Sequence, residues 1–345
     1  MELKIAGGCG EHGRNCFLVE NGEKTFMVDC GIMAGSEDQF PRLSAEDIRR
    51  VKYVFLTHSH ADHTGALPWL YDNGFSGSII ASASTLEQLP FTVGNAVSLE
   101  SVCCGNSGLI GGIELEYGRS GHCVGSVWYE FRSGGSSALF SGDYTENSPV
   151  YCCDKIRGRS ADLAVLDCAY GNDERNLAQC CDEIITAVRE LKIQYDTLVF
   201  PVPKYGRGMD LLKLLRENCP EYICCVDEHF AGQLRETPNK QYWYKTTDIA
   251  ALVYEPSLHC DILFLSDPQL RSEKSRAAAQ NIIKNGGYGV MTGTVENGSF
   301  SEKLISAGKM KLLRYPVHQN YSEFRALVEQ NDFRQVVAYH SAEIR

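Results

Sequence analysis

The chain has 345 residues, which is long for a single hydrophobic core and suits two domains. Hydrophobic residues make up 43%, charged residues 22% and aromatic residues 10%, and this composition excludes a fibrous or largely disordered protein. Lysine and arginine number 33 against 44 acidic residues, so the net charge of −11 does not attract a polyanion or a membrane surface. A nucleic-acid substrate would need a local basic surface or a bound metal.

Targeting signals and cysteines both bear on the compartment. No stretch has the ~20 apolar residues that a membrane-spanning helix requires, and Met1 to Glu20 has no apolar signal-peptide region. The 15 cysteines include four adjacent pairs and no Cys-x-x-Cys, which suits neither a disulfide framework nor a zinc knuckle. We expect a cytoplasmic protein with reduced, mostly buried thiols.

The N-terminal half is typical of short β-strands separated by turns. Apolar and β-branched runs predict strands at 16–19, 24–28, 53–56, 78–81, 127–131 and 138–140. The first two flank Glu20-Asn21-Gly22-Glu23, which indicates a hairpin. Few strong helices interrupt these runs.

After Gly171 the pattern alternates between helices and strands. Apolar residues at helical spacing predict helices over 177–191, 211–215 and 273–284. Buried strands are predicted at 197–202, 222–226, 262–265 and 288–292. Such alternation is typical of a parallel α/β sheet, so we place a domain change near Gly171.

Three imidazoles and a carboxylate lie within six residues directly after the predicted strand at 53–56. His58 and His60 belong to a His-x-His pair, and Asp62 and His63 follow at the start of a predicted helix. Imidazole nitrogens and carboxylate oxygens hold Zn²⁺ while leaving a position open for water. This density indicates a metal site rather than a solvated polar loop.

Further candidate ligands stand alone at turns near strand ends. Asp29 ends the strand at 24–28, Asp143 follows the strand at 138–140, and His340 follows Val336 to Tyr339. His122 lies in the turn Ser120 to Ser126. Each of these four residues, taken singly, is typical of a capping or turn residue. Together with His58 to His63, however, they can complete a metal site.

Together these motifs resemble the metallo-β-lactamase-fold hydrolases, and specifically the β-CASP nucleases that include ribonuclease J and the mRNA 3′-end-processing endonuclease. The segments that carry the resemblance are Gly7 to Asn15, Val28 to Gly31, Leu56 to Pro68, Gly121 to Ser126 and Ser141 to Asp143. Asp167-Cys168-Ala169-Tyr170-Gly171 is similar to the Glu-Ser-Thr-Tyr-Gly-like segment of that group, with Asp in place of Glu. His318 and His340 follow in the expected order.

The resemblance implies an α/β fold, namely an αββα sandwich with an inserted parallel α/β lobe. Residues 1–171 and 312–345 would form the metallo-β-lactamase domain, and 172–311 the β-CASP-like insert. This insert is short for the group, and the chain ends five residues after His340, so we expect no C-terminal RNA-binding or dimerisation domain. A homodimer or an accessory RNA-binding partner would then assist RNA binding.

The resemblance also implies ligand and catalytic roles, with two Zn²⁺ per chain or Mn²⁺ as an alternative. One zinc would be held by His58, His60 and His122, and the other by Asp62, His63 and His340, with Asp143 bridging them. Asp29 would orient a ligand or the bridging water through hydrogen bonds. His318, held by Asp167, would be the general acid.

Three histidines and two glycine-rich loops have less defined roles. We expect His12 to pack near the site, and His229 and His259 to be ordinary surface or core residues. Two loops between a strand and a helix, at 204–208 and 292–299, are suited to cradling phosphate or to being plain turns. The substrate candidates in them are Lys204, Arg207, Thr294 and Ser299.

The predicted function is therefore a zinc-dependent phosphodiesterase, foremost a ribonuclease that cleaves RNA by two-metal hydroxide attack. The alternatives are a phosphodiesterase for DNA or a small nucleotide, a thioester or lactam hydrolase, and an inactive scaffold. Asp167 and His318 argue against the thioester or lactam hydrolase. The complete ligand set argues against the scaffold.

Overall fold

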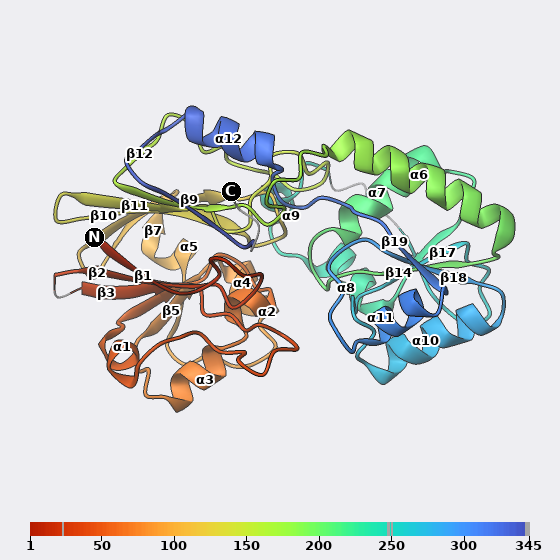
Figure 1. Ribbon diagram of the computed structural model, residues 1–345, viewed down its shortest axis with the longest axis horizontal. Coiled ribbons are helices and arrows are strands. Elements are labelled where there is room, and N and C mark those ends of the chain that lie inside the picture. Colours follow the sequence, from red (N-terminus) through yellow and green to blue (C-terminus); the bar gives the residue numbers. More distant parts are fainter. Residues whose placement is uncertain (23, 247–248, 250, 342–345) are drawn as a thin grey trace. The chain divides into compact units, whose positions relative to one another are not determined.

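The computed structural model describes residues 1–22, 24–246, 249 and 251–341. Within these ranges the chain forms two compact units, shown as ribbons in Figure 1. Unit 1 comprises 1–146, 152–174 and 318–345, and unit 2 comprises 147–151 and 175–317. No helix in the described ranges is long and apolar enough to cross a membrane.

Unit 1 begins with a six-stranded sheet in the order β1-β2-β3-β4-β5-β6. Its strands are β1 (Glu2–Gly7), β2 (Cys16–Asn21), β3 (Lys24–Val28), β4 (Tyr53–Phe55), β5 (Ser78–Ala81) and β6 (Ala96–Ser98). β1 to β3 pair antiparallel, whereas β3 to β6 pair parallel. Glu23, in the predicted hairpin turn, lies outside the described residues. The parallel strands end at one edge, where their connecting loops meet.

A second, seven-stranded sheet in unit 1 has the order β21-β13-β11-β10-β9-β8-β7. Its strands are β7 (Cys103–Cys104), β8 (Ser107–Ile110), β9 (Ile113–Arg119), β10 (Val127–Ser133), β11 (Ser136–Phe140), β13 (Leu163–Asp167) and β21 (Val336–Tyr339). A separate pair joins β12 (Ser160–Ala161) to β20 (Asp332–Phe333). β21 therefore brings the end of the described chain beside β13, from the middle of the sequence.

Aromatic side chains fill the space between the two sheets of unit 1. The ring of Phe26 on β3 lies 4.8 Å from that of Phe131 on β10, and Phe55 on β4 lies 5.8 Å from Tyr129. Helices cover the outer faces of both sheets, as Figure 1 shows for α1 and α3 on one side and α12 on the other. Unit 1 is thus the predicted αββα sandwich, whose core excludes water from both inner faces.

The helices of unit 1 are short, which explains why periodicity revealed few of them. They are α1 (Ala45–Arg50), α2 (Ala61–Thr64), α3 (Leu67–Asp72), α4 (Ala83–Gln88), α5 (Leu99–Val102) and α12 (Tyr321–Glu329). Those before α12 have between four and six residues, less than two helical turns. Such helices form through tertiary packing and capping rather than through their own propensity.

Unit 2 contains a six-stranded sheet in which every described pair of strands is parallel. The order is β16-β15-β17-β14-β18-β19, with β14 (Leu198–Pro201), β15 (Cys224–Val226), β16 (Leu252–Val253), β17 (Ile262–Leu265), β18 (Tyr288–Met291) and β19 (Met310–Leu312). Its helices are α6 (Leu177–Gln194), α7 (Gly208–Asn218), α8 (Glu228–Glu236), α9 (Lys240–Trp243), α10 (Glu273–Lys284) and α11 (Phe300–Ser306). This is the α/β pattern expected after Gly171.

A five-residue stretch, 147–151, packs in unit 2 although unit 1 residues flank it on both sides. The Ser148 hydroxyl donates to Asp210 on α7 at 2.7 Å, and the Tyr151 hydroxyl donates to the Gly206 carbonyl at 2.9 Å. The predicted boundaries of the insert, residues 172 and 311, remain a prediction. No local pattern separates 147–151 from its neighbours.

Candidate metal centre

The candidate ligands of unit 1 lie in loops at the ends of strands from both sheets. The segment from His58 to His63 follows β4 and contains the first three residues of α2, whose N-cap is His60. His122 follows β9, Asp143 follows β11, and His340 follows β21. Because these strands end near one another, side chains from distant positions converge there.

A close backbone approach holds the loop after β3 against the segment from His58 to His63. The Cys30 amide donates to the His63 carbonyl at 2.7 Å, and the Ile32 amide donates to the Ala61 carbonyl at 3.0 Å. Gly31 lies between them, and a Cβ at this position would be 1.6 Å from the Asp62 carbonyl oxygen. Only glycine permits this contact, which fixes the orientation of Asp62 and His63.

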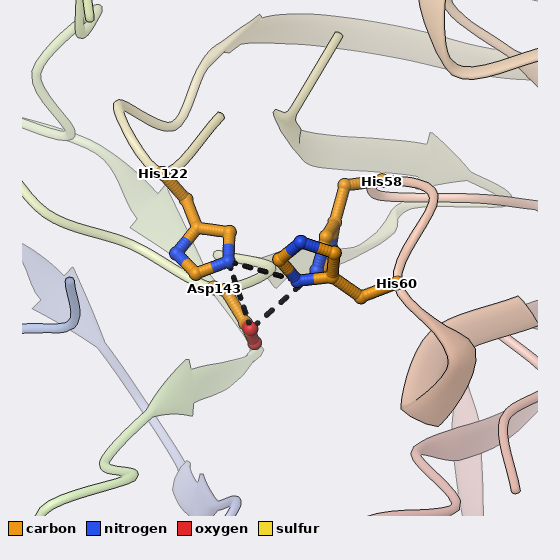
Figure 2. Close-up of side chains that lie close together, drawn as sticks. All are labelled: His58, His60, His122 and Asp143. Carbon is orange, nitrogen blue, oxygen red and sulfur yellow. Dashed lines mark hydrogen bonds and ion pairs between the residues drawn. The ribbon is translucent and has the colours of Figure 1, made fainter. Parts of the chain in front are cut away.

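The first cluster comprises His58, His60, His122 and Asp143, whose ligand atoms all lie within 4.8 Å of one another. The four side chains point toward one another in Figure 2. The Nε2 atoms of His58 and His122 each lie 3.5 Å from Asp143 Oδ2. His122 Nε2 is 3.2 Å from His60 Nδ1. Three imidazoles and one carboxylate oxygen thus face a common point.

The second cluster comprises Asp62, His63, Asp143 and His340, again within 4.8 Å of one another. The other oxygen of Asp143, Oδ1, lies 3.1 Å from His63 Nε2 and 3.2 Å from His340 Nδ1. Asp62 Oδ2 lies 3.1 Å from His340 Nε2. Asp143 therefore directs one carboxylate oxygen to each cluster.

Asp29 supports the second cluster by hydrogen bonding to His63 and to Thr57. Its Oδ2 accepts a hydrogen bond from His63 Nδ1 at 2.7 Å and another from the Thr57 hydroxyl at 2.8 Å. Its Oδ1 accepts from the Thr57 amide at 2.8 Å. Since Nδ1 of His63 carries the proton, Nε2 presents its lone pair to the cluster.

Asp167 and His318 form a hydrogen-bonded pair next to Asp143. His318 Nδ1 donates to Asp167 Oδ2 at 2.7 Å. Asp167 is buried, and it also accepts from the Tyr144 amide at 2.9 Å. These two residues, with Asp143 and His340, make a third group of side chains close enough to hold a metal. His318 can therefore serve as an acid or as a ligand.

Burial and opposite charges compete to set the pKa values of these groups. Burial acts to raise the pKa of Asp143, but His63 and His340 hold it well below its usual range. Burial likewise opposes ionisation of Asp167, yet His318 lowers its pKa to about 2. Conversely, Asp143, Asp29 and Asp62 overcome burial and raise the pKa of His63. The site therefore contains buried carboxylates, whose negative charge requires positive charge beside it.

The donor set fits a divalent cation. His58 is fully buried, and its Nε2 makes no hydrogen bond to any residue that the structure describes. A buried imidazole nitrogen without a partner is costly unless another group binds it. His63, His340, Asp62 and Asp143 supply the nitrogen and carboxylate ligands that transition metals prefer. The clusters can bind metal.

The remaining histidines differ in their surroundings. His12 stacks on His340, with ring centroids 4.4 Å apart and 12° between the planes. His229 is exposed beside Tyr205, and the His259 side chain is 72% exposed. His12 alone of these three lies against a candidate ligand.

The four candidate substrate residues all belong to unit 2. Lys204 and Thr294 are exposed, and Arg207 lies against Gly293, where a Cβ would be 1.9 Å from the guanidinium. Ser299 caps α11 by accepting from the Glu302 amide at 3.1 Å. The loops at 204–208 and 292–299 therefore meet through Arg207 and Gly293.

Two side chains that contact the second cluster were not predicted from the sequence. Asn15 Nδ2 lies 2.8 Å from His63 Nε2, and the Tyr339 hydroxyl donates to Asp143 Oδ1 at 3.2 Å. Asn15 lies within the motif Gly7 to Asn15, which was a usable signal. Tyr339 precedes His340 at the end of an apolar strand, where nothing in the pattern distinguishes it from a core residue.

The chain is similar in sequence and in fold to known proteins. The family model described as "Metallo-beta-lactamase superfamily" matches residues 9–190. The chain is 24% identical over 322 residues to transcription termination factor FttA of Methanosarcina mazei, covering 83% of this chain and 50% of that protein. It is 23% identical to ribonuclease TTHA0252 of Thermus thermophilus, covering 68% and 60%. The probable RNase MJ4 of Methanocaldococcus jannaschii is 23% identical, covering 86% and 74%.

The chain spans half of the length of the M. mazei protein and 39% of the related FttA of Methanothermobacter thermautotrophicus. Among solved structures, a protein of unknown function from Enterococcus faecalis V583 has a TM-score of 0.62 at 12% identity, covering 99% of this chain and 94% of that one. This likeness confirms the predicted fold. The relatives confirm the resemblance to β-CASP nucleases.

Proposed function

Because the chain belongs to the metallo-β-lactamase superfamily, we propose that it is a metal-dependent hydrolase of phosphodiester bonds whose substrate is RNA. One observation carries the proposal: Asp143 directs its two oxygens to two separate clusters, with the Asp167–His318 pair directly beside it. The relatives named ribonuclease support RNA rather than DNA.

We assign one Zn²⁺ to His58, His60, His122 and Asp143 and a second to Asp62, His63, His340 and Asp143. Zn²⁺ suits this mixture of imidazole and carboxylate ligands, and Mn²⁺ is the alternative. Paired divalent ions supply a nucleophilic water at neutral pH and neutralise charge on the phosphate. The Asp29 carboxylate holds His63 in the tautomer that coordination requires.

His318 is the proposed general acid. Its Nδ1 donates to Asp167 at 2.7 Å, which leaves Nε2 to deliver a proton to the departing sugar oxygen. Asp167 stabilises the imidazolium form because a buried carboxylate interacts strongly with it. The carboxylate is itself fixed by the Tyr144 and Ala169 amides.

Lys204, Arg207, Thr294 and Ser299 are proposed to contact substrate phosphates from unit 2. The exposed Lys204 and Thr294 support this, together with the approach of Arg207 to the Gly293 backbone. The cytoplasmic location stays a prediction, as does a homodimer or an accessory RNA-binding partner.

One assay tests the function. The purified protein, with its metal content measured, is given labelled RNA, single-stranded DNA and bis-p-nitrophenyl phosphate. We expect two bound ions per chain and cleavage of RNA that His58→Ala abolishes. His259→Ala is the matched control, since the side chain of this histidine is 72% exposed and lies in unit 2. Cleavage of DNA alone would transfer the proposal to that substrate, and inactivity of the metal-loaded protein on all three would refute it.

A further inference from the structure

The short helix α4 presents polar side chains at every third position. Ser82 is its N-cap, and Thr85 and Gln88 follow at intervals of three residues. Residues three apart share one face of a helix. Ser82 and Thr85 are fully buried, so this polar face is directed into unit 1 and not into solvent.

This face holds the backbone of the loop that carries His122. The hydroxyls of Ser82 and Thr85 both donate to the Gly125 carbonyl, at 2.8 Å and 2.9 Å. Gln88 Nε2 donates to the adjacent Val124 carbonyl at 3.1 Å. Gly125 has φ +87, and a Cβ there would lie 2.7 Å from Thr85 Oγ1. The loop is therefore shaped to receive the helix.

The Gln88 amide also reaches the other ligand loop of the first cluster. The Ser59 hydroxyl donates to Gln88 Oε1 at 2.6 Å. Ser59 lies between His58 and His60 in the sequence, and its own exposure is only 9%. One side-chain amide thus joins the loop that follows β4 in the first sheet to the loop that follows β9 in the second.

We propose that Gln88 is a positioning residue that sets the separation of His58 and His60 from His122. The inference rests on the proposed metal function, and it adds a residue whose described hydrogen bonds go to Ser59 and Val124 rather than to a ligand nitrogen. The two loops come from different sheets, so packing within either sheet does not determine their separation. A ligand displaced by about 0.5 Å no longer has productive metal geometry, and loss of a supporting hydrogen bond typically weakens metal affinity about 10–100-fold.

A purely structural role for Gln88 would give a different result. If its amide only satisfied buried polar groups, removing it would lower the stability of the metal-free fold and would weaken both metal sites together. A positioning role instead affects the first cluster selectively. The second cluster draws on His63, His340 and Asp62, which Gln88 does not contact through any described hydrogen bond.

The test compares Gln88→Met with wild type. Methionine has similar length and neither hydrogen bond. Binding of Zn²⁺ and Co²⁺ is measured by competition with a chromophoric chelator, the Co²⁺ absorption spectrum is recorded, and the metal-free protein is melted. We expect the affinity for one of two ions to fall at least 10-fold, with an altered Co²⁺ spectrum and an unchanged affinity for the other ion. Glu87→Gln is the control, since Glu87 is the exposed neighbour on the same helix.

Ser59→Ala provides an independent variant that removes only one of the two contacts. It should weaken binding of the same ion by less. Combining it with Gln88→Met should add nothing to Gln88→Met alone, because Gln88→Met already removes the hydrogen bond that Ser59→Ala removes. Wild-type affinities and spectrum in both variants would overturn the proposal, as would equal weakening of both ions with a lower melting temperature of the metal-free protein. A wild-type protein that binds no metal would instead refute the proposed function.

Discussion

The imidazole of His12 stacks on that of His340, and its Nδ1 donates a hydrogen bond to the His340 carbonyl oxygen at 2.8 Å. The backbone of His340 has φ 75, in the left-handed region that non-glycine residues rarely adopt. The His340 amide donates to the Gly8 carbonyl at 2.6 Å. The N-terminal loop therefore holds a strained backbone in the conformation that directs His340 to the second cluster.

His12→Phe should keep the stacked ring but remove the hydrogen bond to the His340 carbonyl. We expect metal affinity at the second cluster to fall about 10-fold, the usual scale for a lost supporting contact. Competition with a chromophoric chelator measures this effect. His259→Phe is the control because its side chain is 72% exposed. Unchanged binding of both ions in His12→Phe would show that stacking alone holds His340.

His318→Ala should retain both metal ions but lose RNA cleavage by roughly 10²–10⁴-fold, the usual contribution of a positioned proton donor. Asp167→Asn should act through the same step, since an amide stabilises an imidazolium less than a carboxylate does. Cleavage of bis-p-nitrophenyl phosphate should change far less because p-nitrophenolate leaves without a proton. Equal losses on both substrates, or loss of an ion, would make His318 a metal ligand.

Gly31→Ala should disrupt the centre without altering any ligand. The added Cβ would lie 1.6 Å from the Asp62 carbonyl oxygen, so the segment from His58 to His63 must shift. We expect weaker metal binding and a loss of about 1–3 kcal/mol in the free energy of unfolding, as for other overpacked sites. Gly94→Ala is the control, since its nearest described neighbour would be 3.9 Å away. Comparable stability and metal content in the two variants would contradict the prediction.

Asp210 should make the stability of the protein depend on pH. Burial raises the pKa of this carboxyl to about 7, against a smaller lowering by the hydrogen bond from Ser148. Its folded-state pKa is above its unfolded value, so the folded state binds the extra proton and stability falls as pH rises from about 4 to about 7. Asp210→Asn should remove this loss of stability at higher pH.

The free energy of unfolding, measured by urea denaturation, should therefore be higher for Asp210→Asn than for wild type at pH 8. The two proteins should differ less at pH 5, where the wild-type carboxyl is protonated in the folded state. Glu217→Gln, at an exposed position on the same helix, serves as the matched control. A difference between Asp210→Asn and wild type that is the same at both pH values would contradict the assignment.

Much of the secondary structure is readable from local pattern. The strand predicted at 24–28 is β3 and the helix predicted at 273–284 is α10, with the same bounds. The strands of unit 2 are nearly continuous apolar runs because both faces of a parallel sheet are buried. The helices α1, α3, α4 and α5 were not predicted, since elements of four to six residues show too few apolar repeats to be recognised.

The candidate site, too, was partly predictable from the sequence and partly decided by tertiary packing. The sequence by itself determined which side chains are available, because the dense segment His58 to His63 and the polar residues at strand ends have chemistry that turns rarely need. Only the tertiary structure decided which atoms meet. It directs the two oxygens of Asp143 to different clusters, and it brings His12 against His340 across 328 positions of sequence. Gln88 could not be recognised in advance, because its two hydrogen-bond partners lie on loops from different sheets and only their packing brings them within reach of one amide.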